Sequence, residues 1–203
     1  MIIGGSPATT STSEAVDTPA RAVAVDVGTT HACALTTVGG VKCWNFTYDG
    51  VTGEANPTTP TDVPGLSSGV VAVSSGGFFD CVLTTLSEVK CWGQNPLGQL
   101  GDGTFTYSAT PVNVLLPPGV QLTAIATGAH HACALAAGGG VYCWGWDGAL
   151  PCIPTCVGRN TPAPVAFISG AKTIDAGFTQ TCAVTSQNGV KCWQGTDNDA
   201  GGG

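Results

Sequence analysis

The tetrapeptide Val41-Lys42-Cys43-Trp44 is the feature that most constrains how this 203-residue chain can fold, because it occurs four times with little change. In every copy another cysteine lies ten residues earlier. The four pairs are Cys33 and Cys43, Cys81 and Cys91, Cys133 and Cys143, and Cys182 and Cys192. The first cysteines of successive pairs are 48, 52 and 49 residues apart. A period of this length indicates an array of similar structural units.

Other positions recur in the same register. A glycine always lies five residues before the first cysteine, at Gly28, Gly76, Gly128 and Gly177. An aliphatic residue always follows the first cysteine by two positions, and a valine always precedes the second by two. Because Gly128 follows an alternating stretch, we expect a positive φ at Gly128. So many coincident columns establish four copies of one repeat.

Each repeat has the pattern of short β-strands. In the third, a strand through Cys133, a turn at 138–140 and a strand through 141–144 form a hairpin. A fourth strand opened by proline is expected at 164–167, with its counterpart at 111–114 in the second repeat. Four short antiparallel strands in about 50 residues are typical of a β-propeller blade.

We therefore predict an all-β fold, a β-propeller of about four four-stranded antiparallel blades. The expected repeats span approximately 23–63, 70–114, 122–167 and 171–203, after a flexible Ser/Thr-rich leader or linker at 1–22. An arc of four blades that did not close would expose apolar blade faces. Four blades could close alone, but we favour part of a longer propeller, or a chain that assembles with other copies.

Cysteines ten residues apart can oppose each other across a hairpin, at a distance that suits a disulfide. Structural zinc sites use cysteine spacings of two to four residues, so zinc is disfavoured for these pairs. For Cys152 and Cys156 we favour a disulfide-closed loop over zinc. Five bridges would use all 10 cysteines and would indicate an oxidising location, which is extracellular, cell-surface or periplasmic. We expect no metal and no other cofactor.

The charge of the chain limits its partners. With 6 basic and 13 acidic residues the net charge is −7, so a phosphate-binding patch is not expected and nucleic acid is excluded as a partner. Membrane insertion is not expected either, because no segment has the length and composition of a spanning helix. The N-terminal residues lack the basic region of a signal peptide. A protein partner or self-association is the remaining expectation.

The second repeat contains Trp92-Gly93, Asn95, Gly98-Gln99-Leu100-Gly101 and Asp102-Gly103. This stretch resembles the regulator-of-chromosome-condensation repeat, and the paired cysteines resemble those of secreted bacterial members. The resemblance implies a propeller, usually of seven blades, that mostly makes protein–protein contacts. Known members include nuclear guanine-nucleotide exchange factors and secreted bacterial inhibitors of β-lactamase.

The chain departs from that pattern in two ways. The Gly-Gln-Leu-Gly element is intact only in the second repeat, and the family histidine is kept as His31 and His131 but replaced by Phe79 and Gln180. We expect the histidines to be structural and to bond the backbone of their own blade. The acidic charge argues against chromatin binding, and ten paired cysteines argue against a nuclear location.

The four tryptophans of the repeat are expected in the core, whereas Trp146 lies outside the repeat columns and is expected to be exposed. Candidate partner contacts are loop aromatics and an arginine outside these columns, because such residues are enriched at interface hot spots. They are Phe46, Tyr48, Phe105, Tyr107, Trp146 and Arg159. Packing of these side chains against their own blade is an equally good expectation.

These observations favour a non-enzymatic binding module that presents variable loops for protein recognition outside the cytoplasm. The alternative is a structural or self-assembling extracellular or cell-surface protein. An exchange-type regulator or a hydrolase is less well supported; a hydrolase would need His31 or His131 to reach both a serine and an aspartate in an open cleft. Asn45 begins a glycosylation sequon, which is a weak signal by itself.

Overall fold

The computed structural model describes residues 21–48, 55–57, 59–146, 148 and 158–195, with side chains described outside 46–48 and 55–57. Every regular element in this part of the chain is a β-strand. The strands are β1 (Ala22–Val27), β2 (His31–Thr36), β3 (Val41–Tyr48), β4 (Ala55–Pro57), β5 (Thr61–Asp62), β6 (Val70–Ser75), β7 (Phe79–Thr84), β8 (Val89–Gly93), β9 (Ser108–Asn113), β10 (Leu122–Thr127), β11 (His131–Ala136), β12 (Val141–Trp146), β13 (Gly158–Pro164), β14 (Ala171–Ala176), β15 (Gln180–Thr185) and β16 (Val190–Gln194).

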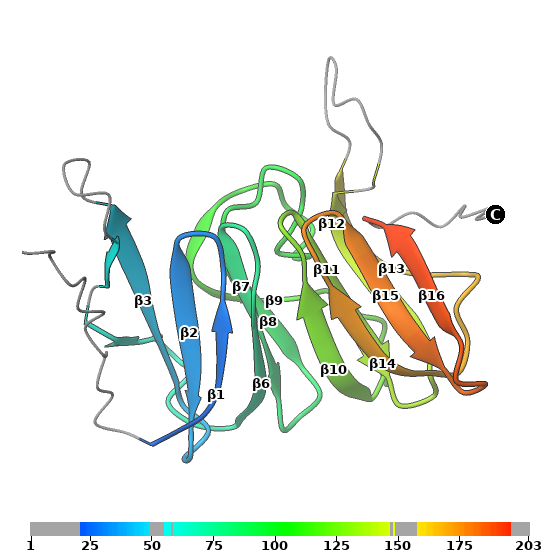
Figure 1. Cartoon of the computed structure of the whole chain (residues 1–203), viewed down its shortest axis with the longest axis horizontal. Helices are drawn as coiled ribbons and strands as arrows, with labels where there is room; N and C mark the ends of the chain where they lie inside the picture. The colour runs from blue at the N-terminus through cyan, green and yellow to red at the C-terminus, as the bar shows by residue number, and fades with distance from the viewer. Residues whose placement is uncertain (1–20, 49–54, 58, 147, 149–157, 196–203) are drawn as a thin grey trace, which may run out of the picture.

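The strands form four antiparallel sheets, which are the blades of a propeller. Blade 1 contains β1–β5, blade 2 contains β6–β9, blade 3 contains β10–β13 and blade 4 contains β14–β16. Figure 1 shows them side by side in an arc, with blades 1 and 4 at opposite ends. The predicted all-β propeller of four blades is confirmed, although β4 and β5 both pair with β3 and the described part of blade 4 has three strands. No described helix is long and apolar enough to span a membrane.

A disulfide joins the second and third strands in every blade. The cysteines oppose each other directly in the strand register, and each pair has a Cα–Cα distance of 4.1 Å. The bridges are Cys33–Cys43, Cys81–Cys91, Cys133–Cys143 and Cys182–Cys192. These are the four hairpin pairs expected from the ten-residue spacing. The pair Cys152 and Cys156 lies outside the described residues.

One turn position fixes the hairpin register. The residue six positions after the first cysteine has a positive φ in every blade, at Gly39 (77°), Ser87 (59°), Gly139 (77°) and Asn188 (60°). A three-residue hairpin loop needs a left-handed residue at this point to match the twist of its strands. Glycine and asparagine adopt that conformation at low cost, so the local sequence sets the register that brings the cysteines together.

The core lies between blades, in three apolar clusters. Leu35 of blade 1 packs with Val82 and Trp92 of blade 2, and Leu83 of blade 2 packs with Trp144 of blade 3. A third cluster joins blades 3 and 4. Three of the four repeat tryptophans lie in the core as expected, with Trp92, Trp144 and Trp193 exposed by 9%, 0% and 3%. Trp44 of blade 1 is only half-buried and lies outside the core clusters. Blades 2 and 3 each contribute to an interface on both faces, and blades 1 and 4 each contribute to one.

The glycine column has a different cause from the one expected. Gly128 is not among the residues with a positive φ, so that prediction was wrong. A Cβ atom at Gly128 would instead collide with the ring of His131 and with the carbonyl oxygen of Gly177 in the next blade. Gly28 and Gly76 meet the next blade in the same way. Glycine is needed at these positions because neighbouring blades approach too closely for a side chain.

The fourth strands also differ from expectation. Strand β9 overlaps the expected 111–114, but β13 ends at Pro164, where a strand over 164–167 was expected to begin. Strand β13 is the outer edge of its sheet, so Pro162 and Pro164 can lie inside it without leaving a ladder acceptor unpaired. The boundaries predicted for the leader and for the repeats stay predictions.

Candidate binding face

The segment that follows β8 in blade 2 leaves its sheet at one end of the molecule, the upper edge in Figure 1. The repeated hairpin turns lie at the opposite end. We call residues 94–107, Leu115 and residues 158–160 the loop rim. Outside the Gly-Gln-Leu-Gly motif the loop rim does not follow the repeat, so this end can distinguish the chain from other propellers.

Asn95 organises the blade 2 part of the loop rim. Its side chain is fully buried, and its Oδ1 accepts from the backbone N–H of Leu100 at 2.9 Å. Its Nδ2 lies within hydrogen-bonding distance of the Asp102 carboxylate at 3.3 Å and of the Thr106 carbonyl oxygen at 3.1 Å. One amide thus joins both ends of the loop, which reduces the entropy that the loop would lose on binding a partner.

The same loop contacts blade 3 directly. The N–H of Gly103 donates to the Asn160 carbonyl at 2.8 Å, and Asn160 Nδ2 donates to the Gly103 carbonyl at 2.7 Å. The indole N–H of Trp144 donates to the carbonyl of Gln99 at 2.7 Å, although Trp144 belongs to the next blade. The Gly-Gln-Leu-Gly motif is therefore an inter-blade clamp, and it holds the beginning of β13 beside the loop.

Three of the candidate contact residues are exposed on the loop rim. Phe105 and Tyr107 are 51% and 58% exposed, and Arg159 is exposed next to Asn160. Leu115, which is 55% exposed, lies near Gly103 and was not singled out from the sequence. Its position just after the repeat's last strand was the available signal. Their role in binding stays a prediction.

The expectation that Trp146 is exposed was wrong, since its exposure is 4%. Strand β12 continues through Trp146, and the backbone N–H of Trp146 donates to the His130 carbonyl at 2.8 Å. Trp146 also pairs with Gly158 in β13, so it belongs to the sheet. Phe46 and Tyr48 lie in β3, but their side chains are outside the described part of the structure.

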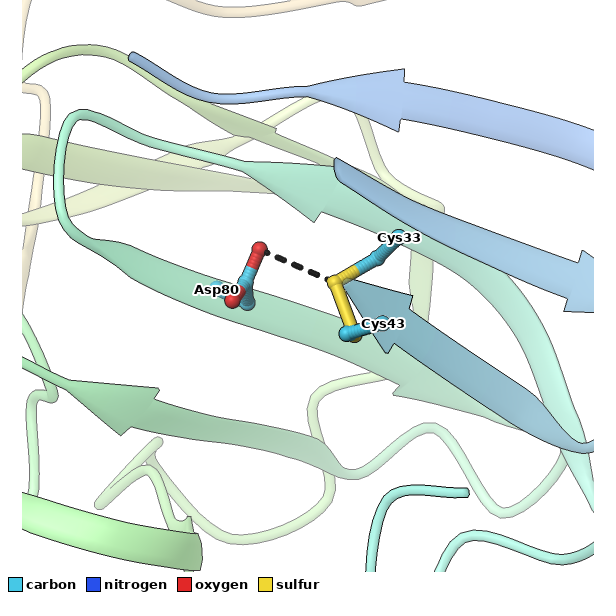
Figure 2. Close-up of side chains that lie close together, drawn as sticks. All are labelled: Cys33, Cys43 and Asp80. Atoms are coloured by element: carbon cyan, nitrogen blue, oxygen red, sulfur yellow. Dashed lines mark hydrogen bonds between the residues drawn. A yellow bond between two sulfur atoms is a disulfide. The ribbon is translucent and has the colours of Figure 1, made fainter. Parts of the chain in front are cut away.

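A second cluster lies between blades 1 and 2, and Figure 2 shows its disulfide and carboxylate. His31 Nε2 donates to Asp80 Oδ1 at 2.9 Å, since a carboxylate only accepts. Asp80 Oδ1 is also 3.3 Å from Cys33 Sγ; this is a contact and not a thiol hydrogen bond, because a disulfide sulfur carries no proton. Among the described residues, only Cys33, Cys43 and Asp80 gather three or more possible metal-ligand atoms. The disulfide occupies both sulfurs.

The two histidines join blades and do not bond the backbone of their own blade as expected. His131 Nε2 lies 2.7 Å from Thr181 Oγ1 in blade 4, as His31 lies beside Asp80 in blade 2. Burial, with the nearby charge of His130, lowers the pKa of His131 to about 4. Both histidines are buried, and among the described residues neither contacts a serine and an aspartate together. The geometry set out above for a hydrolase is therefore not met by the described residues.

The inner strands β1, β6, β10 and β14 surround an open hollow of about 490 Å³. Asp26 and Asp175 lie on its wall, and the remaining lining is mainly backbone, small residues and aliphatic side chains. The Asp26 carboxylate is engaged in hydrogen bonds with backbone N–H groups at 2.8 and 2.9 Å. The residues that line the hollow therefore hold the blades together. They distinguish this chain from other propellers less than the loop rim does.

Sequence comparisons identify the repeat. The model of the regulator of chromosome condensation (RCC1) repeat matches residues 88–135, and a second model of this repeat matches 70–99 and 122–149. No curated protein sequence matches the chain significantly.

Solved structures share the fold. Yeast RCC1 (Prp20), solved with Kap60 bound, has a TM-score of 0.72 at 20% identity over 88% of this chain and 44% of its own. Human WBSCR16 has a TM-score of 0.68 at 22% identity, over 86% and 47%. The ectodomain of the Physcomitrella patens receptor kinase CR4 has a TM-score of 0.54 at 22% identity, over 87% and 39%. This chain spans less than half the length of each of these proteins.

Proposed function

Because this chain carries regulator-of-chromosome-condensation repeats on a propeller stapled by disulfides, we propose that it is a non-enzymatic module that binds another protein through the loop rim. The observation that carries the proposal is the exposure of Phe105 and Tyr107 on a loop that Asn95 holds in place. A rigid loop that displays aromatic side chains has the character of an interface hot spot.

Binding of proteins is also known among structures with this fold. Yeast RCC1 is solved with Kap60 bound, and Prp20p from Saccharomyces cerevisiae is described for its binding to Gsp1p and histones. Those partners are not transferred to this chain, since an identity of 17–20% supports a shared fold and not a shared partner.

The module acts outside the cytoplasm in this proposal. Four disulfides within one chain support an oxidising compartment, because thiols are kept reduced in the cytosol. A similar fold occurs within the ectodomain of a plant receptor kinase, so it is compatible with an extracellular setting.

Site-specific photo-crosslinking tests the binding proposal. A photoreactive amino acid would replace Tyr107 on the loop rim or Leu86 on the opposite end, where the side chain is 76% exposed. Secreted and surface proteins of the source organism would be offered to both variants. We expect a discrete partner to crosslink from position 107 and not from position 86.

The purified partner would then be titrated with three proteins: the unchanged chain, a Phe105→Ser, Tyr107→Ser double variant and a Leu86→Ser control. We expect the double variant to weaken binding on the order of tenfold or more, and the control to leave it unchanged. Equal affinities for all three proteins would refute the role of the loop rim.

A structural, self-assembling protein is the second candidate. It is favoured by the apolar residues that blade 4 exposes at the end of the arc, notably Val190 at 66%. A discrete oligomer of the purified chain in sedimentation would support this role, and a monomer at all concentrations would remove it.

A further inference from the structure

The outer face of blade 4 has the residues of an inter-blade interface but no blade against it. Two repeat columns show this. Leu35, Leu83 and Leu135 are 2–5% exposed, and their equivalent Val184 is 37% exposed. The column of Val41, Val89 and Val141 is 1% exposed throughout, and its equivalent Val190 is 66% exposed. The same positions are thus apolar in all four blades and covered in three.

A series of backbone hydrogen bonds that links each blade to the next ends at the outer face of blade 4. Four residues before the first cysteine of each blade, an N–H donates to the equivalent carbonyl of the next blade. Thr29 donates to Gly77 at 3.3 Å, Gly77 to Ala129 at 3.1 Å and Ala129 to Phe178 at 3.1 Å. Within the described residues the N–H of Phe178 has no recorded acceptor. A fifth blade would supply the acceptor.

The free space around Gly177 also indicates that a blade is to be bound there. Its equivalents Gly28, Gly76 and Gly128 must be glycine because the carbonyl of the following blade lies where a Cβ would be. A Cβ at Gly177 would meet only the Gln180 carbonyl oxygen, at an ordinary 3.9 Å. Nothing described in this chain requires glycine there, whereas a following blade would.

A carboxylate is placed for the same neighbour. In blade 1, Asp26 accepts from its own neighbour Val27 through Oδ1 and from Ser75 of blade 2 through Oδ2, at 2.9 and 2.8 Å. Asp175 holds the equivalent position in blade 4 and accepts from Ala176 through Oδ1 at 2.9 Å. Its Oδ2 is therefore positioned to accept an N–H from the inner strand of a following blade.

One pair of side chains shows what the following blade must carry. At each described blade boundary, the residue two positions before the first cysteine of one blade lies against the residue one position before the first cysteine of the next blade. The two residues are similar in polarity. Polar residues meet in two cases, His31 with Asp80 and His131 with Thr181. Apolar residues meet in the third, Phe79 with Ala132, in one core cluster. Gln180 holds this position in blade 4, and a covered amide needs a hydrogen-bonding partner.

Blade 1 of a second copy does not meet this need. It would bring Ala32 against Gln180, which has no group to bond the amide. The rest of this face of blade 1 is open, since Val25 is 61% exposed. The mismatch at Gln180 is therefore what disfavours head-to-tail assembly of identical chains.

We propose that the outer face of blade 4 binds a further blade of the same repeat type, one with a hydrogen-bonding side chain at the position that Asp80 and Thr181 hold. The exposed valines, the N–H of Phe178, Gly177, Asp175 and Gln180 all face that blade. This inference does not rest on binding through the loop rim, and the two proposals are tested by separate experiments.

The unmodified full chain gives the first test, by sedimentation velocity over a wide concentration range. We expect a monomer, because Ala32 of a second copy would leave the Gln180 amide without a partner. A dimer or ring that Val190→Lys dissociates would show that a second copy covers the face, and would overturn the proposal.

An extended chain gives the second test. Residues after Trp193 would be replaced by a second copy of residues 93–144, which supplies an outer strand for blade 4 and a fifth blade with Ala132 opposite Gln180. Four versions combine Gln180 or Gln180→Phe with the unchanged copy or with Ala132→Thr in the copy. This is a double-mutant cycle on one inter-blade pair.

We expect the two matched versions to unfold at higher temperature than the two mismatched ones, by about 2–4 °C. The matched versions are Gln180 with Ala132→Thr, and Gln180→Phe with the unchanged copy. We also expect slower deuterium uptake in β15 than in the unmodified chain. Mapping of the disulfide in the copied hairpin reports whether the fifth blade has folded. A folded fifth blade without coupling, or without protection of β15, would overturn the proposal.

Discussion

The imidazole of His131 lies 2.7 Å from the hydroxyl of Thr181, across the boundary between blades 3 and 4, where neither side chain is exposed to water. Burial and the charge of His130 lower the pKa of His131 from 6.5 to about 4. The unfolded chain therefore binds a proton at a higher pH than the folded chain does. The stability that this histidine contributes is complete above pH 6.5 and is lost as the pH falls towards 4.

We predict that the free energy of unfolding falls between pH 6.5 and 4, with a contribution from His131 of roughly 3 kcal/mol at most. His131→Gln would flatten this dependence, because the amide can still bond Thr181 and does not titrate. His130→Gln is the comparison variant. It removes the smaller cause of the lowered pKa of His131, so most of the pH dependence should remain, because burial is the larger cause. Identical pH profiles for the unchanged chain and His131→Gln would contradict this assignment.

Gly128→Ala and Gly177→Ala form a matched pair of substitutions in one repeat column. We predict that Gly128→Ala destabilises the chain by about 1–3 kcal/mol, because the new methyl group would collide with the next blade. Gly177→Ala should change stability by no more than about 0.5 kcal/mol, because no described atom lies nearer than 3.9 Å to its Cβ. Urea unfolding measures both, and equal losses would contradict the close-approach explanation.

Two disulfides close loops of equal length in different surroundings. Cys81 and Cys91 are fully buried, whereas Cys182 is half-buried and Cys192 is exposed. Replacing either pair by alanine should cost roughly 2.5–3 kcal/mol through loop closure in the chain-entropy model. The buried pair should cost more, because its removal also leaves a cavity.

Thiol titration during limited reduction gives a second readout of the same difference. We expect Cys182–Cys192 to be reduced before Cys81–Cys91, because a reductant can reach it. Reduction of both at the same rate, together with equal losses of stability, would contradict the burial difference.

Asn95→Ala should destabilise the chain by at least about 2 kcal/mol, because it leaves buried backbone groups of the loop without partners. It should also weaken any binding through Phe105 and Tyr107. Asn113→Ala is the control, because that side chain is exposed and accepts only from Lys90. We expect it to change stability by no more than about 0.5 kcal/mol. Hydrogen exchange in residues 94–107 would report loosening of the loop, and unchanged exchange in Asn95→Ala would contradict its role.

The repeat made most of the fold predictable. The spacing of Cys33 and Cys43 fixed which residues oppose each other, and the recurrence of the tryptophans indicated a core position, which holds for three of the four. Such relations within one hairpin can be read from a single repeat, because the chain itself enforces them.

Relations between blades could not be read in this way. The cause of the glycine column lies in the following blade, and so do the partners of His31 and His131. Trp146 was mistaken for an exposed residue because β12 is longer than the repeat pattern indicates. The interaction of Gly103 with Asn160 joins a loop to strand β13 across 57 residues of sequence, which no local pattern reveals.

We conclude that the repeated cysteines and tryptophans have a structural role in the blades. Peptide mapping of the non-reduced protein by mass spectrometry tests this conclusion most directly. The account predicts Cys33 linked to Cys43, Cys81 to Cys91, Cys133 to Cys143 and Cys182 to Cys192, each within its own hairpin. Free thiols at these positions in the native protein, or links between hairpins, would contradict the blade register and the oxidising location with it.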